Sequence, residues 1–140
     1  MEQITRELSS EMKSRIESQR KWVRDHYLPE SKSEYESIDG KLKLIDIIIK
    51  SNWINKVETN KLQCLGITLG DALVQKLGLR WIEVEDEFGN DPALKFGDTS
   101  IVIFPLTMIS KRIEDGEKVE VFELYNKLVN NINELITKAD

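Results

Sequence analysis

The spacing of apolar residues along this chain changes from a helical period to strict alternation near residue 79. Before that point apolar residues recur at steps of three and four, which is typical of helices with one face on a core. In the stretch "LGLRWIEVEDE", Ile82 and Val84 instead alternate with glutamates, as in a half-buried strand. A chain that contains both patterns combines helices with a sheet, so the sequence predicts an α+β fold.

Three helices are predicted before the sheet, at about residues 2–27, 41–54 and 57–77. The first is expected to end at Pro29, because proline cannot continue a helix. A polar connection over residues 28–40 leads to the second, and loops of that length are often functional or mobile.

The third helix carries signals at both ends and an unusual feature inside. Asn55 and Glu58 have the spacing of a capping box, and Gly78 is typical of a helix end. Gly66 and Gly70 lie one turn apart within it, and each costs about 1 kcal/mol relative to alanine. We therefore expect another element to pack closely against them, in preference to a ligand.

Residues 79–104 are predicted to form a three-stranded antiparallel meander, with turns at "FGND" and "FGDT". One register keeps apolar residues on one face: Val84 with Phe96, Glu85 with Lys95, and Asp86 with Leu94. The third strand, "SIVIF", lacks polar alternation and is expected to be the most buried. Two C-terminal helices, at about 105–116 and 119–136, complete the order.

Length and composition describe one soluble globular domain over residues 1–140. No apolar run is long enough for a membrane span, and the N-terminal residues do not resemble a secretory signal, so a cytoplasmic protein is expected. The single cysteine, Cys64, is compatible with a reducing compartment. A net charge of −5 argues against a general nucleic-acid binder.

Acidic residues are concentrated at 83–91, where the sequence contains Glu83, Glu85, Asp86, Glu87 and Asp91. A calcium site would need the ordered ligands of a binding loop, and a zinc site would need more than one cysteine and one histidine. A carboxylate pair for acid and base catalysis is conceivable, but no aromatic cleft is indicated. Since no catalytic motif occurs, we predict no metal, cofactor or catalytic residue, and the glutamates are expected to face solvent.

Two aspartates stand apart from that solvated face. Asp86 shares the phase of Ile82 and Val84, so it is expected to point inward and to be held by Arg112, Lys111 or backbone donors. Asp71 lies opposite the leucine stripe of its helix. Two alternatives stay open for it: a solvated acid, or a contact to the 28–40 connection.

The stretches "LGLRWIEVEDEFGNDPALKF" and "SIVIFPLTMISKRIEDGE" resemble a bacterial family known as domain of unknown function 3806, and "LGITLGDALVQKLGL" is similar to it as well. The resemblance covers about residues 57–117 and implies a fold and a small bacterial protein, with no assigned reaction. It implies these motif positions: Asp71, Trp81, Glu85, Asp86, Gly89, Asp91, Phe104, Pro105, Lys111 and Arg112.

Three hypotheses about function follow. The first is a non-enzymatic module that binds a basic protein partner through the acidic 83–91 face, as bacterial immunity proteins do with basic toxins. The alternative is an enzyme or small-ligand binder with a charged pocket formed by Asp86, Asp91, Lys111 and Arg112. The third is a subunit whose partner, or second copy, covers Trp53 or Trp81. The sequence does not fix the oligomeric state.

Overall fold

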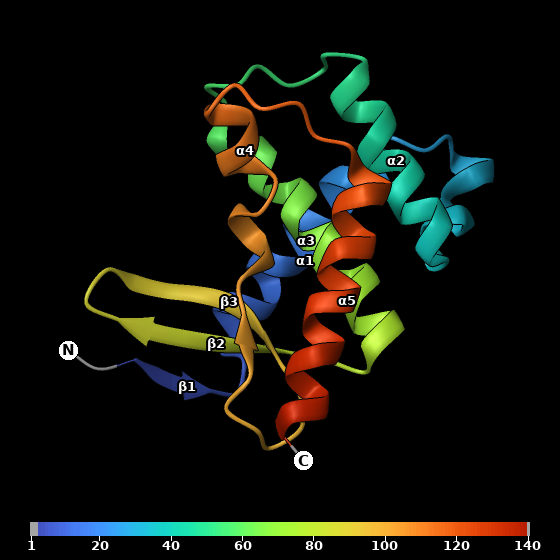
Figure 1. Cartoon of the computed structure of the whole chain (residues 1–140). Helices are drawn as coiled ribbons and strands as arrows, with labels where there is room; N and C mark the ends of the chain where they lie inside the picture. Colours follow the sequence, from blue (N-terminus) through green and yellow to red (C-terminus); the bar gives the residue numbers. More distant parts are fainter. Residues whose placement is uncertain (1–2, 140) are drawn as a thin grey trace.

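The structure is a computed structural model that describes residues 3–139, and it combines helices with one antiparallel sheet of strand order β1-β2-β3-β4 (Figure 1). In chain order the elements are β1 (Ile4–Arg6), α1 (Ser10–Arg24), the 3₁₀-helix η1 (Pro29–Glu36), α2 (Ile38–Lys50), α3 (Thr59–Leu77), β2 (Arg80–Asp86), β3 (Gly89–Lys95), β4 (Val102–Ile103), the 3₁₀-helix η2 (Pro105–Thr107), α4 (Ser110–Glu114) and α5 (Val121–Ala139). The α+β class is thus confirmed. Within residues 3–139, no helix has both the length and the apolar composition that crossing a membrane requires.

The N-terminal segment differs from the long helix expected over residues 2–27. Its first residues form β1, which pairs with β2 at one edge of the sheet, and α1 begins only at Ser10. Ser9 caps α1, since its Oγ accepts a hydrogen bond from the backbone N–H of Met12 at 3.1 Å. The apolar period through Ile4 predicted a longer helix. A local pattern of this kind carries no information on pairing with a strand that lies far away in sequence, such as β2.

The connection over residues 28–40 is ordered rather than an open loop. Most of it forms η1, and Ser37 caps α2 by accepting a hydrogen bond from the N–H of Gly40. The helix α2 therefore starts at Ile38, a little earlier than expected. At the next helix the capping-box contact between Asn55 and Glu58 is present at 2.9 Å, but α3 itself begins at Thr59.

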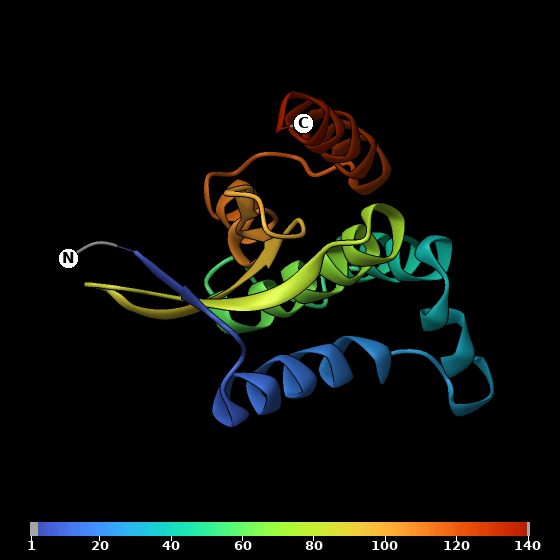
Figure 2. The same ribbon diagram turned by 90° about the horizontal axis from the view of Figure 1, so that it is seen from below.

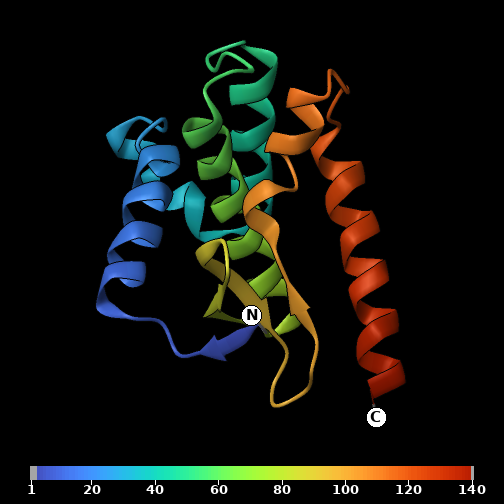
Figure 3. The same cartoon turned by 90° about the vertical axis from the view of Figure 1, so that its left-hand side faces the viewer.

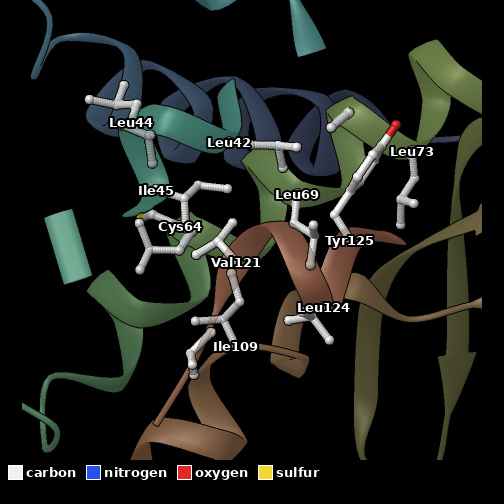
Figure 4. Close-up of a cluster of buried hydrophobic side chains, with 14 of the residues drawn as sticks. Leu42, Leu44, Ile45, Cys64, Leu69, Leu73, Ile109, Val121, Leu124 and Tyr125 are labelled. Carbon is white, nitrogen blue, oxygen red and sulfur yellow. The ribbon is translucent and has the colours of Figure 1, made fainter. Parts of the chain in front are cut away.

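The central element is α3, which contacts α1, α2, α4, α5 and η2. Figures 2 and 3 show α1 and α5 on opposite sides of it, with α2 alongside. The largest buried cluster brings together α2, α3 and α5, and Figure 4 shows its inward-facing side chains, among them Ile45, Leu69 and Val121. Burial of such aliphatic side chains contributes about 1.5–3 kcal/mol each, so this cluster provides much of the stability.

The two glycines of α3 are sites of close packing, as predicted. A Cβ at Gly66 would lie 2.5 Å from the carbonyl oxygen of Leu106 and 2.6 Å from that of Pro105, both in η2. A Cβ at Gly70 would lie 2.5 Å from the ring of Trp81. These distances are shorter than carbon contacts allow, so only glycine lets η2 and the tryptophan approach the helix.

The predicted register of the β2–β3 hairpin is wrong. Val84 pairs with Asp91, Glu85 with Asn90 and Asp86 with Gly89. The turn consists of Glu87 and Phe88, so it comes two residues before the Gly89-Asn90 turn on which the expected register was built. Asp86 and Gly89 occupy the first and last positions of this turn, where aspartate and glycine are favoured, and Asp86 Oδ1 accepts a hydrogen bond from the N–H of Phe88 at 2.8 Å.

Both faces of β2 are covered, which the alternation did not indicate. Ile82 and Val84 pack with Ala93 on one face, while Glu83 is only 2% exposed on the other. The third strand is not the most buried: β4 spans two half-buried residues. The helix expected over 105–116 is divided into η2 and α4. The helix α4 ends at Glu114, and Gly116, where φ is +78°, lies in the turn that follows it rather than at the helix end as expected.

Candidate functional site

Glu83 holds the start of α1 rather than facing solvent, which corrects the prediction for this residue. Its Oε1 accepts hydrogen bonds from the N–H of Ser9 at 3.0 Å and from Ser9 Oγ at 2.7 Å. Its Oε2 accepts one from Asn90 Nδ2 at 2.6 Å. These donors, led by the backbone N–H of Ser9, lower the pKa of Glu83 below its usual value. Glu83 is therefore a structural link between β2 and α1.

Glu83→Gln is expected to lower the free energy of unfolding by about 1–3 kcal/mol at neutral pH, because hydrogen bonds to a charged acceptor are lost. A folded-state pKa below the ordinary value of 4.5 means that this stabilisation is complete above pH 4.5 and is lost as the pH falls below it. Urea unfolding at several pH values should thus show the gap between parent and variant narrowing in acid. The exposed Glu87→Gln variant is the control, and a gap independent of pH would contradict the assignment.

The next two glutamates differ from each other. Glu85 forms an ion pair with Arg6 across β1 and β2, so its charge is already compensated. Glu87 is exposed at the hairpin turn, as predicted. The hairpin projects beyond the helices in Figure 1, so its turn is accessible to a partner. Of the three glutamates, Glu87 is the one that is solvent-exposed and forms no ion pair within residues 3–139.

Asp86 and Asp91 lie together at the end of this hairpin. The register makes them diagonal neighbours on one face of the sheet, a relationship that places Cα atoms roughly 7–8 Å apart. Both are half-buried, and among residues 3–139 neither forms an ion pair. Of the three predicted kinds of partner for Asp86, the backbone donor is the one found, the N–H of Phe88, whereas Arg112 and Lys111 form no ion pair with it among the described residues. Two adjacent carboxylates that form no ion pair can attract a further positively charged group.

These aspartates line a hollow of about 390 Å³ between α1, α3, the hairpin and the η2–α4 segment. We call it the hairpin cleft. Its lining residues are Arg15, Gln63, Asp86, Asp91, Pro92, Phe104, Leu106, Thr107 and Lys111. The volume is in the range of about 300–1,000 Å³ that is common for ligand sites. Apolar carbons and groups of both charges meet there, as in many binding sites.

The walls of the hairpin cleft are set by packing behind them. Met12 and Ile16 of α1 pack with Ile67 of α3 and Leu106 of η2 in a separate buried cluster. This cluster fixes α1 against η2, and the close contact at Gly66 fixes η2 against α3. Rigid elements on several sides make a cleft that exists without a ligand.

Positive charge enters the hairpin cleft from two elements. Arg15 of α1 is half-buried, and its Nη1 lies 3.5 Å from the carbonyl oxygen of Asn90. Lys111 of α4 is exposed. Within the described residues, neither forms an ion pair with Asp86 or Asp91, although all four line the same cleft. Arg112 is not part of it: its Nη1 donates to the carbonyl oxygen of Met108 at 2.6 Å, and it lines a different hollow beside α5.

Asp71 is the centre of a polar network away from the hairpin cleft. Arg20 binds it through two hydrogen bonds, Nε to Oδ2 at 2.6 Å and Nη2 to Oδ1 at 2.8 Å. The hydroxyl of Tyr35 and the indole N–H of Trp81 also donate to it, at 2.9 and 3.0 Å. Since Tyr35 belongs to η1, the contact to the 28–40 connection is the alternative that holds. The acid is part of the fold and not a free surface group.

Burial and charge explain the ionisation of this network. The carboxylate of Asp71 raises the pKa of Arg20 above its usual value, so the guanidinium stays charged. Desolvation raises the pKa of Tyr35, which keeps its hydroxyl protonated as a donor. Thr68 completes the network with a hydrogen bond to the Tyr35 oxygen at 2.9 Å. Four elements, α1, η1, α3 and β2, are joined by these contacts.

The remaining reactive side chains are engaged in packing. Burial raises the pKa of the Cys64 thiol to about 11, and its Sγ donates to the carbonyl oxygen of Asn60. His26 lies between Trp22 and Trp53, and its Nδ1 is 2.7 Å from the Trp22 carbonyl oxygen. Trp81 is packed on Gly70, whereas Trp53 is 52% exposed. Over residues 3–139, no group of three metal-binding side chains comes together.

The sequence identified part of the hairpin cleft and missed the rest. Asp86, Asp91 and Lys111 were expected at one site and do line it, whereas Arg112 was expected and does not. Arg15 and Gln63 were not predicted. Both come from helices far from the hairpin in sequence, and the polar face of an amphipathic helix does not indicate which of its residues will meet another element.

Comparisons with known proteins agree with this architecture. A family model described as Domain of unknown function (DUF3806) matches residues 41–125, more than half of the chain. A crystal structure of a protein from Bacteroides thetaiotaomicron VPI-5482 superposes with a TM-score of 0.75 at 17% sequence identity. The alignment covers 94% of this chain and 48% of that one, so this chain spans about half the length of the solved protein. Among curated proteins no match is found.

Proposed function

The chain belongs to the family described as Domain of unknown function (DUF3806), and we propose that it is a non-enzymatic binding module that holds a basic group of a protein partner in the hairpin cleft. The observation that carries this proposal is the pair Asp86 and Asp91. Both carboxylates line one preformed cleft, and neither forms an ion pair among the described residues. A lysine or arginine side chain would supply the missing countercharge.

The proposal assigns partner binding to those acidic residues of the 83–91 stretch that form no ion pair or buried hydrogen bond within residues 3–139. Glu83 and Glu85 are engaged within the chain, which leaves Asp86, Glu87 and Asp91 for a partner. Glu87 at the exposed turn would attract a basic surface at longer range, and such attraction raises association rates. Neutralisation of a basic toxin in a bacterial cytoplasm is one setting in which a small acidic module of this kind would act.

The same cleft supports binding better than catalysis. A catalytic pair of carboxylates needs the two acids in different environments, one raised in pKa and one ionised. Here both aspartates are half-buried at the same end of one hairpin. The cysteine and the histidine, which could act as nucleophile and base, lie outside the lining of the hairpin cleft. The charges at the cleft therefore have a role in recognition.

Asp86→Asn combined with Asp91→Asn is expected to weaken binding of a basic probe by about tenfold, because two half-buried countercharges are removed. The probe is an acetylated and amidated Gly-Arg-Gly-Arg peptide, titrated at low salt and followed by backbone NMR shifts. Stability should change little, since Asp86 is not held by a buried cation, and urea unfolding checks this.

The matched control is Asp98→Asn combined with Asp115→Asn, which removes the same net charge at two exposed positions away from the hairpin cleft. It should reduce affinity less than about twofold, because distant exposed charges are screened. Equal weakening by both double variants would mean that the probe responds to overall charge. In that case the hairpin cleft is not the binding site.

A further inference from the structure

The hairpin cleft contains two cationic side chains that binding of a basic group does not use. Arg15 approaches from α1 and Lys111 from α4, so they enter from different elements. In the described part of the chain neither of them is paired with Asp86 or Asp91. Opposite charges that share one cleft without forming ion pairs leave room for a ligand between them. Such a ligand would carry a positive group for the aspartates and a negative group for the cations.

The backbone beside the cleft limits how a partner can bind. Among residues 3–139, β4 pairs with Leu94 and Lys95 of β3, and no described strand neighbours the outer edge of β3 before Leu94. An extended peptide could add to such an edge, but Pro92 lies in this segment and has no N–H to donate. Strand addition is therefore disfavoured, and recognition depends on side-chain charges and on the apolar surface of Phe104 and Leu106.

We propose that the hairpin cleft recognises a dipolar segment of the partner, in which a basic side chain and a carboxylate lie within one or two residues of each other. This rests on the proposed function and names its ligand. The basic side chain binds Asp86 and Asp91, and the carboxylate binds Arg15 and Lys111. A hollow of about 390 Å³ accommodates two such side chains. A purely basic ligand would instead place its second charge against the two cations, at a cost in affinity.

Two peptides that differ in one group test this inference: acetyl-Gly-Arg-Gly-Glu-amide and acetyl-Gly-Arg-Gly-Gln-amide. The parent protein is expected to bind the glutamate peptide about fivefold more tightly, the size of effect that one added ion pair gives. In Lys111→Gln combined with Arg15→Gln, this preference should disappear, because the carboxylate of the glutamate peptide loses both of its partners. Lys111→Gln alone should reduce the preference, and it keeps the test valid if loss of Arg15 disturbs α1.

The matched control is Lys127→Gln, an exposed cation of α5 outside the hairpin cleft, which should leave the preference unchanged. Equal affinity of the parent for both peptides would overturn the dipolar ligand while leaving the basic-partner proposal intact. If neither peptide binds, the proposed function itself fails. Free arginine is the last ligand to be tested. If it binds as tightly as the glutamate peptide, the hairpin cleft is a site for a small molecule, and the proposal of a protein partner is overturned.

Discussion

Replacement of Asp71 by alanine is expected to lower the free energy of unfolding by about 3–5 kcal/mol, the largest effect of a single polar substitution in this chain. The side chain of Asp71 is 11% exposed and that of Arg20 is 25% exposed. Without the carboxylate, a largely buried guanidinium loses its two hydrogen bonds to Asp71 and keeps the one to Glu17. The donors of Tyr35 and Trp81 lose their acceptor at the same time. Urea unfolding at neutral pH measures the change.

Two further variants separate charge from packing at this network. Asp71→Asn keeps one acceptor oxygen but removes the charge, so we expect most of the loss to remain. Asp71→Leu combined with Arg20→Leu removes the stranded charge and should recover part of the stability. Asp98→Ala, at an exposed loop position, should stay within about 0.5 kcal/mol of the parent. If Asp71→Ala is as mild as this control, the network does not stabilise the fold.

Asp71 also shows what a sequence can and cannot indicate about a buried charge. The wheel position placed it opposite the leucine stripe, which correctly separated it from the main core. The covering elements, η1 and α1, are reached through tertiary contacts that no local pattern encodes. The sequence therefore identified Asp71 as a candidate site residue. Its structural role follows from the four hydrogen-bond donors that surround it in the fold.

The hairpin shows a different kind of failure. Strand positions and antiparallel order were predicted from alternation, and β2, β3 and β4 do follow one another in the sheet. The register was wrong because apolar matching was applied to a strand that is covered on both faces. The sequence did carry the correct signal, since aspartate and glycine three residues apart, at Asp86 and Gly89, are favoured at the ends of a type I turn.

The prediction of close packing at Gly66 and Gly70 was correct because it depended only on the local sequence of the helix. Glycine inside a helix has a known cost, so two glycines one turn apart indicate a compensating contact. The pattern could not identify the contacting atoms, which belong to η2 and to Trp81. This difference matters for the hairpin cleft, because η2 contributes Leu106 and Thr107 to its wall. Packing at the glycines therefore affects the position of the candidate site.

Gly66→Leu is expected to lower the free energy of unfolding by at least about 3 kcal/mol, at or above the upper end of ordinary overpacking. The obstacle at Gly66 is backbone: the carbonyl groups of Pro105 and Leu106 cannot rotate away as a side chain can. At Gly70 the obstacle is the Trp81 ring, which can shift if its hydrogen bond to Asp71 is given up. Gly70→Leu should therefore also be strongly destabilising, but less so than Gly66→Leu.

The control for both variants is Lys76→Leu, at an exposed position of the same helix, which should change stability by less than about 0.5 kcal/mol. An unchanged denaturant midpoint for Gly66→Leu would mean that η2 does not pack against α3 as described. A smaller insertion, Gly66→Ala, links this contact to the site. It gains about 1 kcal/mol of helix propensity, yet must displace η2 to fit, so it should also weaken binding of the dipolar peptide in the hairpin cleft.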